Sequence, residues 1–350
     1  MKNQSITEAM LQFIEESPTA FHAAANVEAL LLENGFEKLE NLAEGALVPG
    51  GSYYTMQNGS AVLAVKIPEN PAEGFRIAAS HSDSPCFKIK EVPEMKVENT
   101  YVKLNVEKYG GMILSPWLDR PLSVAGRVFV AGKPEVKLVN LKKDLLIIPN
   151  VAIHFNREIN NGFAYNPQTD MAPLMGLDQE LSIKKLCAEA ADVAEEEILG
   201  SDLYVYNRDK GRIMGADDSL IGSPRLDDLQ CAYATLRGFL ASKPEEFISV
   251  YALFDNEEVG SGTKQGADST FLEEFLEIVL ENIYPDKNRL WKRSFYQNSF
   301  LLSADNGHAV HPNHPEKTDP TNRPYLNGGV VLKYNGSQKY TTDGYSAAIV

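Results

Sequence analysis

The sequence has few cysteines and no long apolar run. Its three cysteines, Cys86, Cys187 and Cys231, are widely spaced and odd in number, so we expect neither a disulfide framework nor a zinc site built from thiolates. No apolar stretch approaches the roughly 20 residues that a membrane-spanning helix needs. We therefore expect a chain that does not cross a bilayer and that would hold any metal with other ligands.

Positive charge is also scarce. The chain has 33 Lys and Arg against 48 Asp and Glu, a formal net charge of -15. Such a balance repels phosphate backbones and anionic lipids, so nucleic acid and membranes are not expected partners. The first residues, MKNQSITEAM, lack the apolar stretch and cleavage site of a secretory signal. The sequence thus predicts a cytoplasmic protein.

Both ends of the sequence alternate between helical and strand patterns. Ser5 and Glu8 form a capping box before apolar residues at helical spacing, and a second helical pattern runs from about Thr19 to Asn34. Short apolar runs bounded by Gly, Pro and Asn predict buried strands. These runs are SAVLAVKI (60–67), FRIAAS (75–80), ISVYALF (248–254) and SFLLSA (299–304).

Between these parts, from about residue 91 to 215, short β-like runs alternate with Gly, Pro and Asn. We interpret this segment as an inserted β-rich domain, and a length of 350 residues favours two domains. The predicted fold is α/β, with a mostly parallel mixed sheet flanked by helices. Its catalytic domain would comprise 1–90 and 216–350, and the insert 91–215.

Polar residues suited to metal binding follow three predicted strands. His81 follows FRIAAS, Glu257 and Glu258 follow ISVYALF, and Asp305 follows SFLLSA, while Asp227 begins a predicted helix. Ligands of open α/β sheets bind beyond the carboxyl ends of the strands. Histidine and carboxylates favour Zn²⁺, with Mn²⁺ or Co²⁺ possible. Two ions sharing a hydroxide, with a neighbouring Glu moving protons, would suit amide hydrolysis.

Taken singly, several of these residues have another interpretation. Asp227 and Asp228 could stabilise the N-terminus of a helix. His81 could be a hydrogen-bonded loop histidine, and Asp305 a turn residue. The adjacent glutamates are harder to explain, because two carboxylates beside an apolar strand cost stability unless a cation is present. The conjunction of these residues is what favours a metal site.

The motifs resemble those of the aspartyl aminopeptidase family of zinc metallopeptidases. The matching stretches cover essentially the whole chain in the family's order and spacing. They are SPTAFHA (17–23), SHSDSPCFKIK (80–90), SPRLDDL (223–229), FDNEEVGS (254–261), SADNGHAVHPN (303–313) and GGVVLKYNGSQKY (328–340). The resemblance implies a metalloaminopeptidase that removes N-terminal residues from peptides, with a preference for Asp or Glu.

The resemblance also implies roles for individual residues. His81, Asp227 and Asp305 would hold one zinc ion. Asp227 would bridge to a second ion, which Glu258 would bind, and Glu257 would be the general base. The intact enzyme would hold two zinc ions per subunit.

The resemblance further implies self-association, with the insert forming dimers within a dodecamer. His154, in NVAIHFNRE, matches a position that reaches into the active site of a neighbour; otherwise it is a histidine on a strand edge. Lys333, in GGVVLKYNG, matches the segment lining the specificity pocket, where it would pair with an acidic substrate side chain. Its alternative is a lysine on the polar face of an edge strand.

The sequence departs from the family at a few positions. Asp228 and Asn256 stand where the family has Asn and His. A further histidine ligand of the second zinc is expected beyond the last motif, but the sequence stops at Val350 without one. We therefore expect a truncated chain or an incomplete second site. An inactive scaffold, and a two-zinc amidohydrolase or deacylase of the same architecture, stay open as alternatives.

Overall fold

The computed structural model of the chain describes residues 5–40, 47–132 and 135–350. By its internal contacts the chain divides into two units, Met1–Ala304 and Asp305–Val350. The first unit contains two six-stranded sheets, and each sheet packs against helices of its own.

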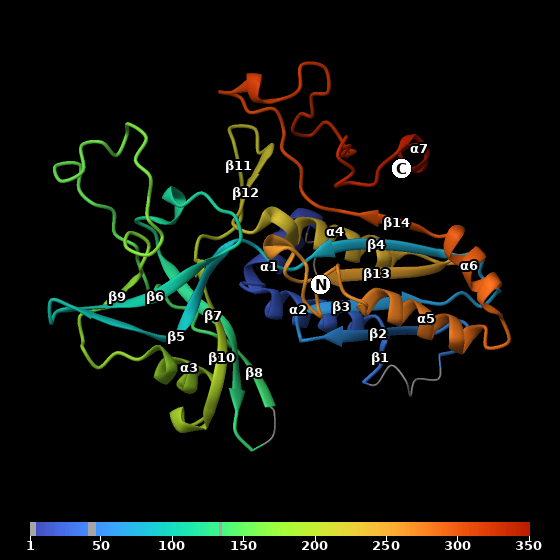
Figure 1. The fold of residues 1–350 in the computed structure, drawn as a ribbon, viewed down its shortest axis with the longest axis horizontal. Helices are drawn as coiled ribbons and strands as arrows, with labels where there is room; N and C mark the ends of the chain where they lie inside the picture. Colours follow the sequence, from blue (N-terminus) through green and yellow to red (C-terminus); the bar gives the residue numbers. More distant parts are fainter. Residues whose placement is uncertain (1–4, 41–46, 133–134) are drawn as a thin grey trace. The chain divides into compact units, whose positions relative to one another are not determined.

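The first sheet is mixed. Its strands are β1 (Glu37–Lys38), β2 (Ser52–Gln57), β3 (Ala61–Lys66), β4 (Phe75–His81), β13 (Ile248–Phe254) and β14 (Phe300–Ser303). They lie in the order β1-β2-β3-β13-β4-β14 (Figure 1). β4 runs parallel to both of its neighbours, whereas β3 runs antiparallel to β2 and β13. The predicted α/β fold is confirmed, and all four predicted strands form part of this sheet.

Helices cover both faces of the mixed sheet (Figure 1). One core combines Val62 and Tyr251 of the sheet with residues of helices α1 (Ile6–Glu16), α2 (Ala20–Glu33) and α4 (Leu226–Ala241). A second core combines Leu63 and Val250 with residues of helices α5 (Phe271–Ile283) and α6 (Arg289–Gln297). Adjacent strand residues point to opposite faces, which explains the continuous apolar runs of β3 and β13. No helix in the described part of the chain is both long and apolar enough to cross a membrane.

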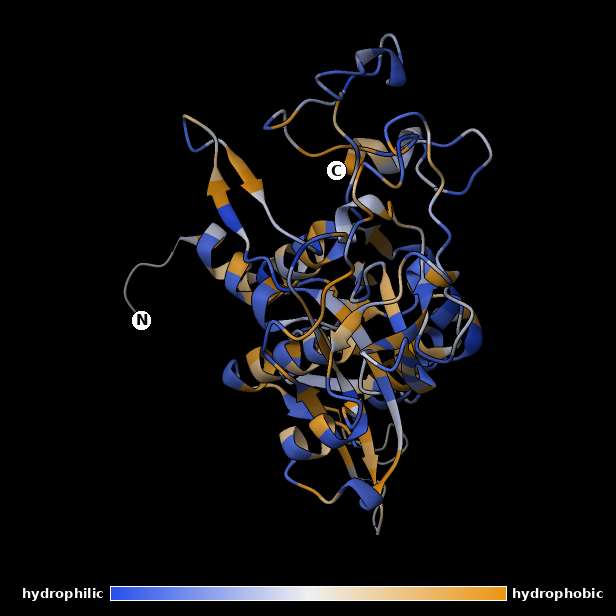
Figure 2. Cartoon of the chain, turned by 90° about the vertical axis from the view of Figure 1, so that its left-hand side faces the viewer, coloured by the Kyte–Doolittle hydropathy of each residue, from blue (hydrophilic) through white to orange (hydrophobic). Residues whose placement is uncertain are grey.

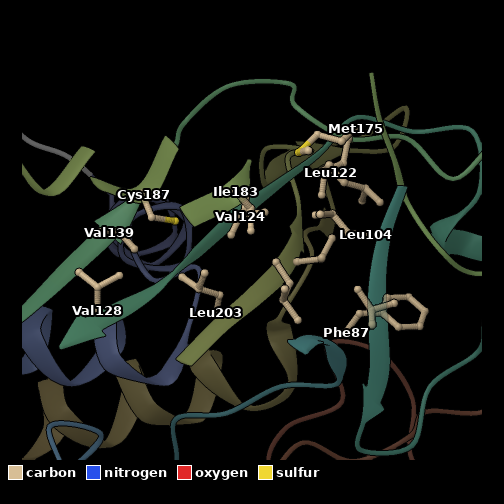
Figure 3. Packing of buried hydrophobic residues seen from close by; sticks show 14 of the residues in the cluster. Phe87, Leu104, Leu122, Val124, Val128, Val139, Met175, Ile183, Cys187 and Leu203 are labelled. Atoms are coloured by element: carbon tan, nitrogen blue, oxygen red, sulfur yellow. The ribbon is translucent and has the colours of Figure 1, made fainter. Parts of the chain in front are cut away.

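The second sheet is antiparallel throughout. Its strands are β5 (Cys86–Val97), β6 (Tyr101–Tyr109), β7 (Leu122–Val130), β8 (Glu135–Asn140), β9 (Leu174–Gly176) and β10 (Ile198–Asn207), in the order β8-β7-β10-β5-β6-β9. Helix α3 (Ile183–Ala191) packs on it, so that Ile183 and Cys187 join Val124 and Leu203 in one core (Figure 3). The β-rich insert is therefore present, while its exact division at 91 and 215 stays a prediction.

A short hairpin projects beyond this sheet. It consists of β11 (Arg212–Met214) and β12 (Leu220–Gly222), which pair antiparallel. Figure 2 shows its two strands largely in the hydrophobic colour, standing apart from the packed strands. Ile213, Met214, Leu220 and Ile221 are between 38% and 46% exposed. An apolar surface of this kind is typical of an interaction site.

The second unit, Asp305–Val350, has little regular secondary structure. A 3₁₀ turn covers Pro315–Lys317, and a short helix, α7 (Gly344–Ile349), follows an N-cap at Asp343. The Asp343 carboxylate accepts the backbone N–H of Ser346 at 2.8 Å. The remainder is held mainly by turns and local side-chain contacts.

Candidate metal centre

His81 is the last residue of β4 and is only 4% exposed. Its Nδ1 lies 3.2 Å from both the backbone oxygen and Oδ1 of Asp83. Both oxygens can only accept, so Nδ1 carries a hydrogen. On the other side of the ring, Nε2 lies 3.6 Å from Oδ1 of Asp227 and 3.9 Å from Oδ2 of Asp228. Nε2 is thus the atom left to bind a cation.

The surroundings of His81 favour positive charge. Burial disfavours the imidazolium, but the carboxylates of Asp227, Asp83 and Asp228 outweigh it and raise the pKa of His81 to about 11. The same negative potential that holds a proton on Nε2 would favour a metal ion there. The environment of His81 would therefore favour a cation at Nε2.

Asp227 and Asp228 differ in role although they are adjacent. The sequence places Asp227 at the start of a helix, but both residues have non-helical dihedral angles, the bond between them is cis, and regular helix starts at Leu229. Asp228 is fully buried and its Oδ2 accepts the backbone N–H of His81 at 3.2 Å. The Asp227 side chain is 52% exposed. Only Asp227 is therefore placed to meet a ligand from solvent.

Glu257 and Glu258 lie on a 3₁₀ turn, Glu257–Val259, that follows β13. Because β13 and β4 are parallel neighbours, this turn comes beside His81. Glu257 is exposed and Glu258 is half-buried. Burial raises the pKa of Glu258 to about 7; His81 opposes this shift, while Asp83, Asp227 and Glu257 add to it.

Asp83 is a residue of the candidate site that the sequence did not single out. It is 4% exposed, and its two oxygens accept the backbone N–H groups of Glu257 and Glu258, each at 3.2 Å. It also holds Nδ1 of His81. A carboxylate behind a metal-binding histidine fixes the ring's tautomer and orientation. The sequence feature that could have identified Asp83 is its position two residues after His81, in SHSD.

These side chains form groups that could hold metal ions. The ligand atoms of His81, Asp227 and Asp228 lie within 4.8 Å of one another, and so do those of His81, Glu257 and Glu258. An imidazole nitrogen with several carboxylate oxygens is a donor set that Zn²⁺ accepts. No cysteine joins either group of described residues. The donor chemistry therefore fits zinc held by histidine and carboxylates, as the sequence predicts.

A cavity of about 280 Å³ adjoins the centre. Asp83 and Asp227 form part of its wall, and aromatic surface comes from Tyr204 of β10 and from Trp117, on a 3₁₀ turn between β6 and β7. The cavity thus lies where the two sheets of the first unit meet. Apolar walls with a few polar groups are typical of sites for small ligands.

Asp305 and Lys333 belong to the second unit. Asp305 directly follows Ala304, whose N–H donates to the backbone oxygen of Ala79 at 2.7 Å. Within its own unit, Asp305 Oδ2 lies 3.1 Å from Nζ of Lys333, which also donates to the backbone oxygen of Asn306 at 2.8 Å. Lys333 therefore has a carboxylate partner within its own unit.

His154 lies in an exposed turn rather than on a strand edge. Apolar residues surround it in the sequence: Val151 is 55%, Ile153 is 49% and Phe155 is 86% exposed. The segment around His154 therefore presents apolar surface to solvent, as a segment that contacts another molecule would.

A family model for aminopeptidase I zinc metalloproteases (M18) matches residues 13–350. A probable M18 family aminopeptidase 2 from Clostridium acetobutylicum is 44% identical over 361 residues, covering 100% of this chain and 83% of the relative. The Ape4 structure in complex with Nbr1 has a TM-score of 0.93 at 32% identity, covering 98% of this chain and 71% of that one.

The S. cerevisiae mApe1 dodecamer has a TM-score of 0.86 at 26% identity, with coverage of 99% of this chain and 81% of that one. These likenesses extend over both sheets of the first unit, and the family is one whose members use zinc. With its histidine and carboxylate cluster in place, the chain belongs to the M18 family of zinc metalloproteases and is a metalloaminopeptidase.

Proposed function

We propose that this aminopeptidase hydrolyses the first peptide bond of peptides and prefers an N-terminal Asp or Glu. The observation that supports the mechanism is the convergence of His81 with Asp227 and with Glu257 and Glu258. A preference for acidic residues is a finer proposal. It rests on Lys333 and on the resemblance of its segment to a specificity pocket.

The proposed ligands divide between two ions. By the resemblance, His81, Asp227 and Asp305 would hold one zinc, and Asp227 and Glu258 would hold a second; Mn²⁺ or Co²⁺ would also suit oxygen-rich ligands. Bound zinc acts as a Lewis acid that polarises a carbonyl and makes water more acidic. Asp228 is not proposed as a ligand, because its buried Oδ2 is engaged by the N–H of His81.

Glu257 is the proposed general base. It is exposed, so substrate and water can reach it, and the hydrogen bond from its backbone N–H to Asp83 holds the turn in place. It would accept a proton from the attacking water and deliver it to the nitrogen of the leaving peptide. The adjoining cavity of about 280 Å³ gives room for a side chain beside Asp227.

Self-association is also proposed for this chain. The relative from S. cerevisiae forms a dodecamer, and this chain exposes apolar side chains both on the β11–β12 hairpin and around His154. In a dimer His154 would enter the neighbouring active site and donate a hydrogen bond to the tetrahedral oxygen formed there. Cytoplasmic location likewise remains a proposal from the sequence.

Lys333 is proposed to recognise the acidic side chain of the first substrate residue. Its ammonium already pairs with Asp305. Metal binding by Asp305 would leave Lys333 available to another carboxylate. The proposed recognition is thus an exchange of partners, from Asp305 to the substrate carboxylate.

The test is a comparison of substrate classes. Dipeptides beginning with Asp, Glu, Leu or Ala are assayed beside N-acyl amino acids, with zinc-saturated and chelator-treated protein. We expect zinc-dependent release of N-terminal Asp and Glu faster than Leu and Ala. Faster cleavage of N-acyl amino acids would instead favour a deacylase, and equal rates for all four dipeptides would contradict the acidic preference.

A further inference from the structure

The end of β6 in the antiparallel sheet meets the turn that carries Glu258. The hydroxyl of Tyr109, the last residue of β6, donates to Oδ2 of Asp83 at 2.7 Å and accepts from Nδ2 of Asn256 at 2.8 Å. The next residue, Gly110, has a φ of +78°, and a Cβ placed there would lie 3.0 Å from Cβ of Glu258. Two successive residues of the insert therefore lie against this turn.

Asp83 is the point where these contacts converge. Its hydrogen-bond donors are Nδ1 of His81, the N–H groups of Glu257 and Glu258, and the hydroxyl of Tyr109. An ionised carboxylate has about four acceptor sites, so four donors saturate it. A buried carboxylate that lacks a donor is costly. The Tyr109 bond, at 2.7 Å, is the shortest of the four.

The tyrosine itself is fixed as a neutral donor. Burial, with added repulsion from Asp83 and Asp255, raises the pKa of the Tyr109 hydroxyl well above its usual value. Its ring packs edge-on against Tyr204, with centroids 5.6 Å apart. The ring is therefore anchored in the insert by packing, while the hydroxyl alone reaches Asp83 and Asn256. Removing only the hydroxyl would separate these two roles.

We propose that Tyr109 is a positioning residue through which the β-rich insert sets the geometry of the metal ligands. Its hydroxyl orients Asp83 and Asn256, and Asp83 in turn fixes the imidazole of His81 and the turn of Glu257 and Glu258. This inference rests on the proposed metal site, because it concerns the same ligands. It assigns to the insert a part in metal binding within one subunit.

The test measures zinc affinity and amide exchange, not only turnover. For Tyr109→Phe, competition of the metal-free protein with a chromogenic chelator should show zinc binding weakened about tenfold, as for other outer-sphere changes. The amides of Glu257 and Glu258 should also exchange faster. Tyr54→Phe is the matched control, because it too removes a buried tyrosine hydroxyl that donates to a carboxylate, that of Glu28 at 3.0 Å. It should change neither quantity.

Two further variants keep the outcome decisive. Should Tyr109→Phe not fold, Asn256→Gly removes the amide bonded to Tyr109 at a φ of +64° that glycine tolerates, and it should weaken zinc binding in the same direction. His81→Ala must abolish zinc binding; if it does not, the proposed metal site itself fails. If His81→Ala loses zinc while Tyr109→Phe binds it as tightly as Tyr54→Phe, the positioning role is refuted and the metal site stands.

Discussion

The two sheets of the first unit differ in where their strands end. In the mixed sheet, β13, β4 and β14 are parallel, so their carboxyl ends share one edge. His81 and the turn of Glu257 and Glu258 lie at that edge. In the antiparallel sheet, neighbouring strands run in opposite directions, so their carboxyl ends are divided between two edges. Parallel pairing thus brings candidate metal ligands together at one edge. The antiparallel sheet instead supplies hydrogen bonds to the residues behind these ligands.

The largest expected effect lies at the parallel edge. Glu257→Gln should lower kcat about 10²–10⁴-fold while zinc stays bound, because an amide cannot accept the proton of the attacking water. Steady-state kinetics with metal analysis checks this. Glu277→Gln, an exposed change on α5, is the control and should leave kcat unchanged. Turnover near that of the wild type in Glu257→Gln would remove Glu257 from the mechanism.

The second test asks whether the insert also acts across subunits. His154→Ala should lower kcat about 10²–10³-fold, the usual loss for one hydrogen-bond donor to the tetrahedral oxygen. Because His154 would serve a neighbour, mixed assemblies of His154→Ala and Glu257→Gln subunits should recover activity that neither variant has alone. Assembled mixtures without recovery would contradict action in trans.

A third test concerns the second unit, which belongs to neither sheet. Lys333→Met should lower kcat/KM for N-terminal Asp and Glu by roughly 2 kcal/mol, about thirtyfold, more than for Leu or Ala. This loss is small for a broken charge pair, because the Lys333 side chain is 25% exposed and solvent screens its charge. Equal losses for all four substrates would indicate damage to Asp305 instead of lost recognition.

The pH dependence of zinc binding tests whether His81 and Glu258, at the parallel edge, bind the metal. Zinc must displace a proton from His81 below its pKa of about 11, and a second from Glu258 below its pKa of about 7. Affinity should fall about tenfold per pH unit between pH 9 and 7, and more steeply below pH 7. Calorimetry in buffers of different ionisation enthalpy counts the released protons. An affinity independent of pH would show that these groups do not bind zinc.

The smallest effect on the fold is expected at the exposed hairpin. Ile221→Asp replaces a side chain that is 38% exposed, so it should change the free energy of unfolding by about 0.5 kcal/mol or less. It should nevertheless reduce the mass of the assembly, measured by light scattering, because a carboxylate would be buried in the contact. An unchanged mass would remove the hairpin from the interface.

The sequence by itself predicted the elements with a strong periodic pattern. The four apolar runs became strands of the mixed sheet, and the capping box of Ser5 and Glu8 begins α1. Helices α3 and α6 were missed because each has only 9 residues, too few for a clear helical period. His81, Glu257 and Glu258 could be selected because each follows a recognisable strand, and parallel order then requires their ends to meet.

Only the tertiary structure decided how these groups are held. Packing between distant segments lets Asp83 join His81 to the glutamate turn and lets Tyr109 reach Asp83 from another sheet. The same packing buries Asp228 and leaves Asp227 exposed. The same holds for the partner of Lys333. Periodicity encodes which face of an element is buried, but a hydrogen bond between separate elements depends on their packing, which no local pattern specifies.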